Sequence, residues 1–118
     1  RLFEGTPAQM HASLSTLAAL PAATRIYCAH EYTQANLQFA HAVEPDNKDI
    51  KVRLEVVQDL CAAGRMTLPS EMALELLTNP FLRADNPSVV SAASNHTGKP
   101  LAPGVETFAA VRAWKDSF

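Results

Sequence analysis

The sequence predicts a mainly α-helical fold, in which a helical domain follows one helix and one strand that belong to an α/β domain. Three observations support this fold class. Apolar residues recur at helical spacing through most of the chain. Residues that start or stop helices, such as Thr6-Pro7 and Glu44-Pro45, separate these stretches. Only residues 25–29 have the composition of a β-strand.

The first helix is predicted over about 6–20. Thr6 can serve as its N-cap, Pro7 lies in its first turn, and Gln9 occupies the capping-box position. The apolar residues that follow share one face of a helix: Met10, Leu14 and Leu17. The segment therefore has both a start signal and an apolar stripe that can pack against another element.

Residues 25–29, Arg-Ile-Tyr-Cys-Ala, form the one predicted strand. A strand needs partners for its backbone N–H and C=O groups. Because the sequence suggests no second strand, we expect this one to lack a partner in the chain. The chain also begins without a Met before Met10. We therefore expect a fragment, with residues 1–30 as the edge of a larger α/β domain and residues 31–118 as a self-contained helical domain.

The rest of the chain is predicted to form helices joined by short turns. Each has a capping or breaking residue at its ends: Thr33 to about Val43, Asp46 to a stop at Gly64, Ser70 to Leu77, Asp85 or Asn86 to Ser94, and Val105 to the C-terminus. The second of these helices has an apolar face: Ile50, Leu54, Val57 and Cys61. His96 falls outside the predicted helices, in a polar loop.

Composition and charge argue against several classes of protein. The net charge is −2 and no basic cluster occurs, so a nucleic-acid partner is not expected. No apolar run is long enough to cross a bilayer, so a membrane partner is not expected either. The two cysteines lack C-x-x-C spacing, which favours a reducing, cytoplasmic compartment.

His30 is the first candidate functional residue, because it ends the predicted strand on the same side as Cys28. It could be a metal ligand, a catalytic base or a structural residue. A metal site needs three or four ligands, and the chain has no H-x-H, H-x-x-x-H or C-x-x-C pattern. Cys28 as a nucleophile with His30 as its base is disfavoured, because a buried strand would not leave a thiolate accessible.

Tyr32, Arg112 and Lys115 complete the candidates. Tyr32 follows His30 in a turn, where its hydroxyl can face a cleft or the solvent. Arg112 and Lys115 are three residues apart on the last predicted helix, hence on one face. Two cations on one face can clamp a carboxylate, or they can form a solvated surface beside Asp116. The residue pattern alone leaves both alternatives open.

Six stretches in series resemble the C-terminal half of the hydroxyacylglutathione hydrolase (glyoxalase II) family. They are RLFEGT, IYCAHEYTQANLQFA, VEPDN, TLPS, TNPFLR and VRAWKDSF. The resemblance covers essentially the whole chain. It implies a two-domain thioesterase whose N-terminal metallo-β-lactamase domain is missing here. Residues 1–30 would be the C-terminal edge of that domain, and residues 31–118 would be the helical glutathione-binding domain.

The resemblance also implies roles for single residues. His30 would be the one metal ligand of this chain, at the reacting end of the substrate site. Tyr32 would contact the glutathione backbone, and Arg112 and Lys115 would bind the glycine carboxylate of glutathione. Apart from the metal ligand, the resemblance implies no catalytic residue in this chain.

Two positions at the N-terminus are covered as well. Arg1 matches a basic residue that contacts the tripeptide. Phe3 falls where some family members have tyrosine, so the resemblance implies a packing contact at most.

The implied activity of the parent protein is hydrolysis of S-D-lactoylglutathione to D-lactate and glutathione. Two divalent metal ions, zinc or else iron or manganese, would supply an acidified water. With His30 as its only ligand, this chain is expected to lose the metals and to be inactive alone. The rival hypotheses are a non-enzymatic helical interaction module, and a related metallo-β-lactamase-fold hydrolase acting on another thiol carrier.

Overall fold

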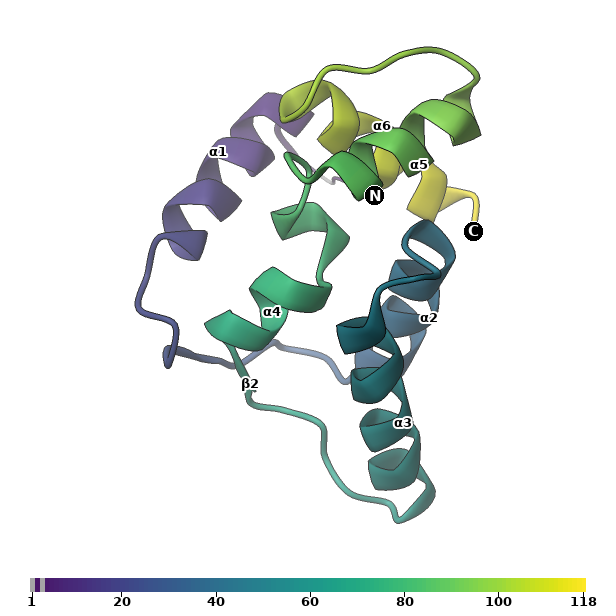
Figure 1. The fold of residues 1–118 in the computed structure, drawn as a ribbon. Helices are drawn as coiled ribbons and strands as arrows, with labels where there is room; N and C mark the ends of the chain where they lie inside the picture. The colour runs from purple at the N-terminus through teal and green to yellow at the C-terminus, as the bar shows by residue number, and fades with distance from the viewer. Residues whose placement is uncertain (1, 3) are drawn as a thin grey trace. The chain divides into compact units, whose positions relative to one another are not determined.

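A computed structural model describes residue 2 and residues 4–118, and in this part of the chain the fold is mainly α-helical, as predicted (Figure 1). The helices are α1 (Pro7–Ala18), α2 (Thr33–Val43), α3 (Lys48–Ala62), α4 (Met72–Thr78), α5 (Pro87–Thr97) and α6 (Val105–Asp116), with the 3-10 helix η1 (Pro80–Leu82). The strands are β1 (Arg25–Ile26) and β2 (Ser70–Glu71). The site predictions for Arg1 and Phe3 lie outside the described residues.

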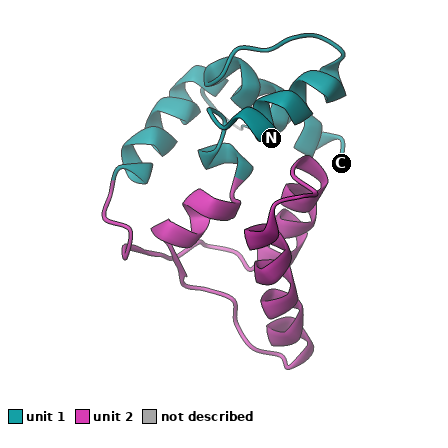
Figure 2. Ribbon diagram, viewed as in Figure 1, with its two compact units in different colours: residues 1–19, 80–118 teal, residues 20–79 magenta. Residues whose placement is uncertain are grey.

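The chain divides into two compact units, coloured separately in Figure 2. Unit 1 comprises residues 1–19 and 80–118, and unit 2 comprises residues 20–79. Unit 1 is therefore built from the two ends of the chain. The predicted domain boundary after residue 30 concerns a larger protein and stays a prediction.

Unit 1 is assembled around α6. α1 and α5 both pack against α6, and α1 also contacts η1. The buried apolar side chains of this unit come mainly from α5 and α6: Val89, Ala93, Phe108 and Val111, with Ala84 from the preceding turn. α1 begins as predicted, because Thr6 and Gln9 form a complete capping box. No side chain of α1 is buried, so this helix lies on the surface of its unit.

Unit 2 contains the pair α2 and α3, which pack along one another. Their shared core consists of Leu37, Ala40, Ile50 and Val57, with Leu54 packed against it. Three of the four residues predicted for the apolar face of α3 therefore meet α2. The fourth, Cys61, is exposed, because it lies in the last turn beyond that core.

The prediction that the strand lacks a partner in the chain is wrong. β1 pairs antiparallel with β2, with Arg25 opposite Glu71 and Ile26 opposite Ser70. Two more backbone bonds extend the contact, from the N–H groups of Met72 and Ala73 to carbonyls of residues 24 and 22. The strand is also shorter than 25–29. A two-residue partner 45 positions away has too little sequence pattern to be recognised, although it supplies a backbone partner for residues 25 and 26.

Some helix ends differ from the prediction by a residue or more. Asn47 caps α3 in place of Asp46, accepting from the backbone N–H groups of residues 49 and 50. Ser70 belongs to β2, so α4 starts later. α5 continues to Gly98, whose left-handed backbone (φ 75°) ends it, so His96 is helical and not in a loop.

Candidate functional site

The turn between β1 and α2 holds the first two candidates. The rings of His30 and Tyr32 stack on one another, with centroids 5.1 Å apart and an angle of 19° between their planes. Both residues are exposed, and Tyr32 as a whole is 61% accessible to solvent. The imidazole and the phenol ring therefore lie side by side and are both accessible to solvent.

Glu31, between them in the sequence, makes the polar contacts of this turn. Its Oε1 accepts from the backbone N–H of Thr67 (2.7 Å) and of Leu68 (3.2 Å). Its Oε2 accepts from the Thr67 hydroxyl at 2.6 Å. The Thr67 hydroxyl also lies 2.7 Å from that of Thr33, the first residue of α2. The turn is therefore fastened to the loop after α3.

These bonds affect the ionisation of Glu31. The pKa of its carboxyl is lowered, chiefly by the hydrogen bond from the Thr67 side chain and then by the Thr67 backbone N–H. Glu31 is not among the functional residues predicted from the sequence. A carboxylate before a helix is a visible signal, but its partners lie 36 and 37 residues further on.

Arg112 and Lys115 lie on α6 in unit 1, three residues apart as predicted. The Arg112 Nη2 donates to Asp116 Oδ1 at 2.9 Å. Its guanidinium carbon lies 5.0 Å from the centroid of the Phe81 ring. The Arg112 Nε is buried and has no hydrogen-bond partner among the described residues. One edge of the guanidinium is thus paired, while Nε keeps an unused donor.

Aromatic packing in unit 1 fixes the position of Phe81. Its ring meets Phe108 edge-on, with centroids 5.5 Å apart. Phe108 in turn meets His11 of α1, with centroids 5.7 Å apart. Because Phe108 is almost fully buried, the ring beneath Arg112 rests on the core of the unit.

A second stack lies close to Lys115. His96 of α5 and Trp114 of α6 lie almost parallel, at 8°, with centroids 4.2 Å apart. Trp114 therefore packs against another ring. His30 and Tyr32 belong to unit 2, and Arg112, Lys115 and this stack belong to unit 1.

Metal-binding side chains do not cluster in the part of the chain that the structure describes. No group of three or more His, Cys, Asp or Glu side chains there could hold a metal ion. Cys28 is an exposed free thiol outside the strand, so the burial used to argue against it as a nucleophile is absent. The ring of His30 stacks on Tyr32 and not on the Cys28 thiol.

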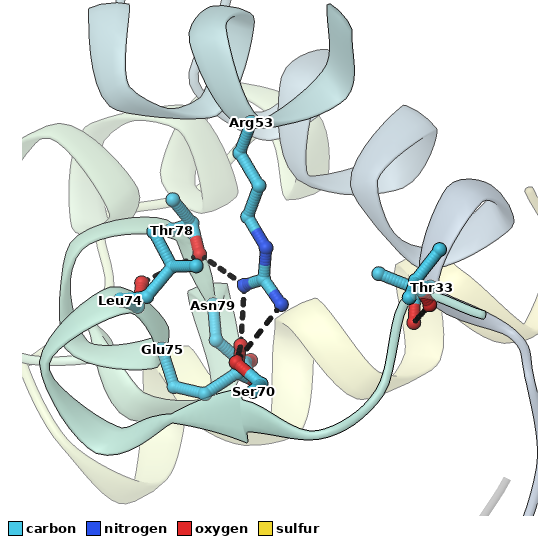
Figure 3. A network of polar contacts seen from close by, with 8 residues as sticks. Thr33, Arg53, Ser70, Leu74, Glu75, Thr78 and Asn79 are labelled. Carbon is cyan, nitrogen blue, oxygen red and sulfur yellow. Dashed lines mark hydrogen bonds and ion pairs between the residues drawn. The ribbon is translucent and has the colours of Figure 1, made fainter. Parts of the chain in front are cut away.

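A side-chain polar network in unit 2 is centred on Arg53 and joins separate elements (Figure 3). Its guanidinium bonds to Glu75, to the Thr78 hydroxyl (2.7 Å) and to the Ser70 hydroxyl (3.1 Å). The ion pair with Glu75 is largely buried, since the two side chains are 10% and 15% exposed. The network joins α3 to α4 and β2 and so supports the short sheet.

Within residues 2 and 4–118, none of the helices combines the length and the apolar character needed to cross a membrane.

Comparison with known proteins gives consistent matches. The family described as "Hydroxyacylglutathione hydrolase C-terminus" matches residues 31–118. A hydroxyacylglutathione hydrolase of Pseudomonas fluorescens (strain SBW25) is 61% identical over 118 residues, which is all of this chain and 46% of that protein. One from Halorhodospira halophila (strain DSM 244 / SL1) is 53% identical over 117 residues, again 46% of its length. The chain thus spans about half the length of the curated relatives it matches.

Proposed function

Because the chain belongs to the family of the hydroxyacylglutathione hydrolase C-terminus, we propose that it is the glutathione-binding part of a thioester hydrolase. The proposed substrate of the whole protein is S-D-lactoylglutathione, cleaved to D-lactate and glutathione. The observation that carries this proposal is the similarity along the whole chain to proteins named hydroxyacylglutathione hydrolase, at 53% to 61% identity.

We assign the glycine carboxylate of glutathione to Arg112 and Lys115. Both cations lie on one face of α6, and a guanidinium can bind a carboxylate with two parallel hydrogen bonds. Support comes from the Phe81 ring beneath the guanidinium. Since Asp116 already holds Nη2, the ligand carboxylate would share the guanidinium with Asp116 or displace it.

Tyr32 and His30 are assigned separate roles, as the resemblance implies. The exposed Tyr32 hydroxyl would bond the peptide backbone of glutathione, and His30 would ligate a metal ion. One imidazole is too few for a metal site, because catalytic zinc usually has three protein ligands. No group of three or more metal-binding side chains occurs among the described residues. The two proposed metal ions, zinc or else iron or manganese, would need ligands from outside the chain.

The contribution of this chain to the reaction would be binding and orientation. Contacts to the glycine carboxylate and to the peptide backbone lie far from the thioester carbonyl, so they would fix the substrate without touching the reacting atoms. The exposed free thiols of Cys28 and Cys61 support a reducing location, and we place the protein in the cytoplasm.

The test uses the full-length protein and two ligands. Hydrolysis of S-D-lactoylglutathione is followed by loss of the thioester, and glutathione binding is measured by calorimetry beside glutathione whose glycine carboxylate is esterified. We expect turnover, and weaker binding of the ester. A protein that neither hydrolyses the thioester nor distinguishes the two ligands would instead be a helical interaction module. Hydrolysis of other acyl-thiols only would identify a different thiol carrier.

A further inference from the structure

We propose that Glu31 is a positioning residue. It holds the side chains of His30 and Tyr32 in their stacked arrangement. This inference rests on the proposed function, because the roles of His30 and Tyr32 in binding are themselves proposals. Glu31 would touch neither substrate nor metal. It would act by fastening the backbone between the two functional side chains to the loop after α3.

The ring contact between His30 and Tyr32 and the hydrogen bonds of Glu31 involve different atoms and different partners. His30 and Tyr32 contact each other through their rings. The Glu31 carboxylate, by contrast, uses both oxygens on the loop, accepting from two consecutive backbone N–H groups and one hydroxyl. A carboxylate that accepts several hydrogen bonds is a strong local anchor, because each bond is charge-assisted.

The turn has few other restraints. Residues 27–32 and 65–69 contain no regular secondary structure. α2 begins after Tyr32 without a side-chain cap of its own. Glu31 therefore joins two irregular segments, and the Thr67 hydroxyl extends the link to Thr33 in the first turn of α2. Removing the carboxylate would free the backbone between the strand and the helix, which sets the distance between the imidazole and the phenol.

Two substitutions at Glu31 distinguish a positioning role, which depends on its hydrogen bonds, from an effect of its negative charge alone. Glu31→Ala removes all three bonds. Glu31→Gln keeps a carbonyl oxygen for the two backbone N–H groups, and its amide can donate to the Thr67 hydroxyl. The matched control is Val57→Ala, which removes buried apolar volume from the α2–α3 core of the same unit and destabilises it without contacting the turn.

The experiment uses the full-length protein and two readouts. The first is kcat/KM for S-D-lactoylglutathione. The second is the nuclear Overhauser effect between the His30 and Tyr32 ring protons, in protein labelled at histidine and tyrosine, which needs no activity. We expect Glu31→Ala to abolish the ring–ring signal and to lower kcat/KM about tenfold to a hundredfold, as for residues that orient a ligand side chain. Glu31→Gln should retain both, and so should Val57→Ala at a lower Tm.

Three other outcomes decide against the proposal or against the proposed function on which it rests. If Glu31→Ala keeps the ring–ring signal and kcat/KM, Glu31 positions nothing. If Val57→Ala loses both readouts as Glu31→Ala does, the effect is general destabilisation. If wild-type protein does not hydrolyse the thioester, the proposed function is wrong, and the ring–ring signal alone then decides whether Glu31 orders this turn.

Discussion

The guanidinium of Arg112 lies over the ring of Phe81, 5.0 Å from its centroid, so a side chain from η1 supports the cation that α6 carries. This contact predicts that Phe81→Leu raises KM for the glutathione thioester with little change in kcat. A cation–π contact of about 0.5–1 kcal/mol corresponds to a rise of roughly two- to fivefold. Steady-state kinetics of the full-length variant measure it. Ile50→Val, in the α2–α3 core of unit 2, should lower the Tm and leave KM unchanged.

Arg112→Ala and Lys115→Ala are both expected to raise KM. Each removes a charged contact made equally in the ground state and the transition state, which weakens binding without slowing the chemical step. The loss should be about 1.5–3 kcal/mol for each. In the double variant the losses should not add, because the two cations share one carboxylate. A fall in kcat with KM unchanged would contradict the clamp.

The Arg53 network predicts a large loss of stability on substitution. Arg53→Ala removes the cation that pairs with the Glu75 carboxylate. The remaining negative charge is then largely buried, because only 15% of the Glu75 side chain is exposed. Breaking such a pair costs about 3–5 kcal/mol, which a urea unfolding curve resolves. Arg65→Ala is the control, since this exposed residue lies just beyond α3, and it should change the free energy of unfolding by no more than about 0.5 kcal/mol.

Glu31 predicts a pH dependence of stability with a definite sign. Its pKa is lower in the folded chain than the usual 4.5, because Thr67 donates to the ionised carboxylate. The stabilisation is therefore present above this value and is lost as the pH falls through the folded-state pKa. Urea unfolding in metal-free buffer should show a stability difference between wild type and Glu31→Gln that shrinks on acidification. If the stability difference between the two proteins grows as the pH falls, the pKa of Glu31 is not lowered by folding.

The chain 1–118 by itself is predicted not to hydrolyse the thioester, even with excess zinc. It offers one proposed metal ligand, which cannot replace the three of a usual catalytic site. Mixing it with a separately made N-terminal half of the parent protein should restore turnover, and His30→Ala should abolish that recovery. His96→Ala, which changes an exposed histidine of the other unit, should not. Turnover by the chain alone would place the catalytic centre elsewhere.

The helices could be predicted because their signals are local. The capping box at Thr6 and the breaks at Glu44-Pro45 and Gly64 act within a few residues, and the structure places helix ends at or beside each of them. The pairing of β1 with β2 could not be predicted in this way. It depends on two residues far away in the sequence, which carry no alternating pattern of their own.

In the candidate site, too, local features could be predicted and contacts between distant segments could not. The spacing of Arg112, Lys115 and Asp116 on one helix already predicted that they would lie close together. The support of Arg112 by Phe81 and the anchoring of Glu31 by Thr67 depend on contacts between separate segments. The sequence around Arg112 does not point to Phe81, and the sequence around Glu31 does not point to Thr67. Only the folded chain reveals these two contacts.

The placement of the aromatic residues makes each unit spectroscopically distinct. Trp114 is the single tryptophan and lies in unit 1, stacked on His96, whereas both tyrosines, Tyr27 and Tyr32, lie in unit 2. Selective excitation of the indole would therefore follow the loss of the α5–α6 contact, and tyrosine absorbance would follow the other unit. One unlabelled sample could then reveal whether the two ends of the chain melt together with its middle or in a separate step.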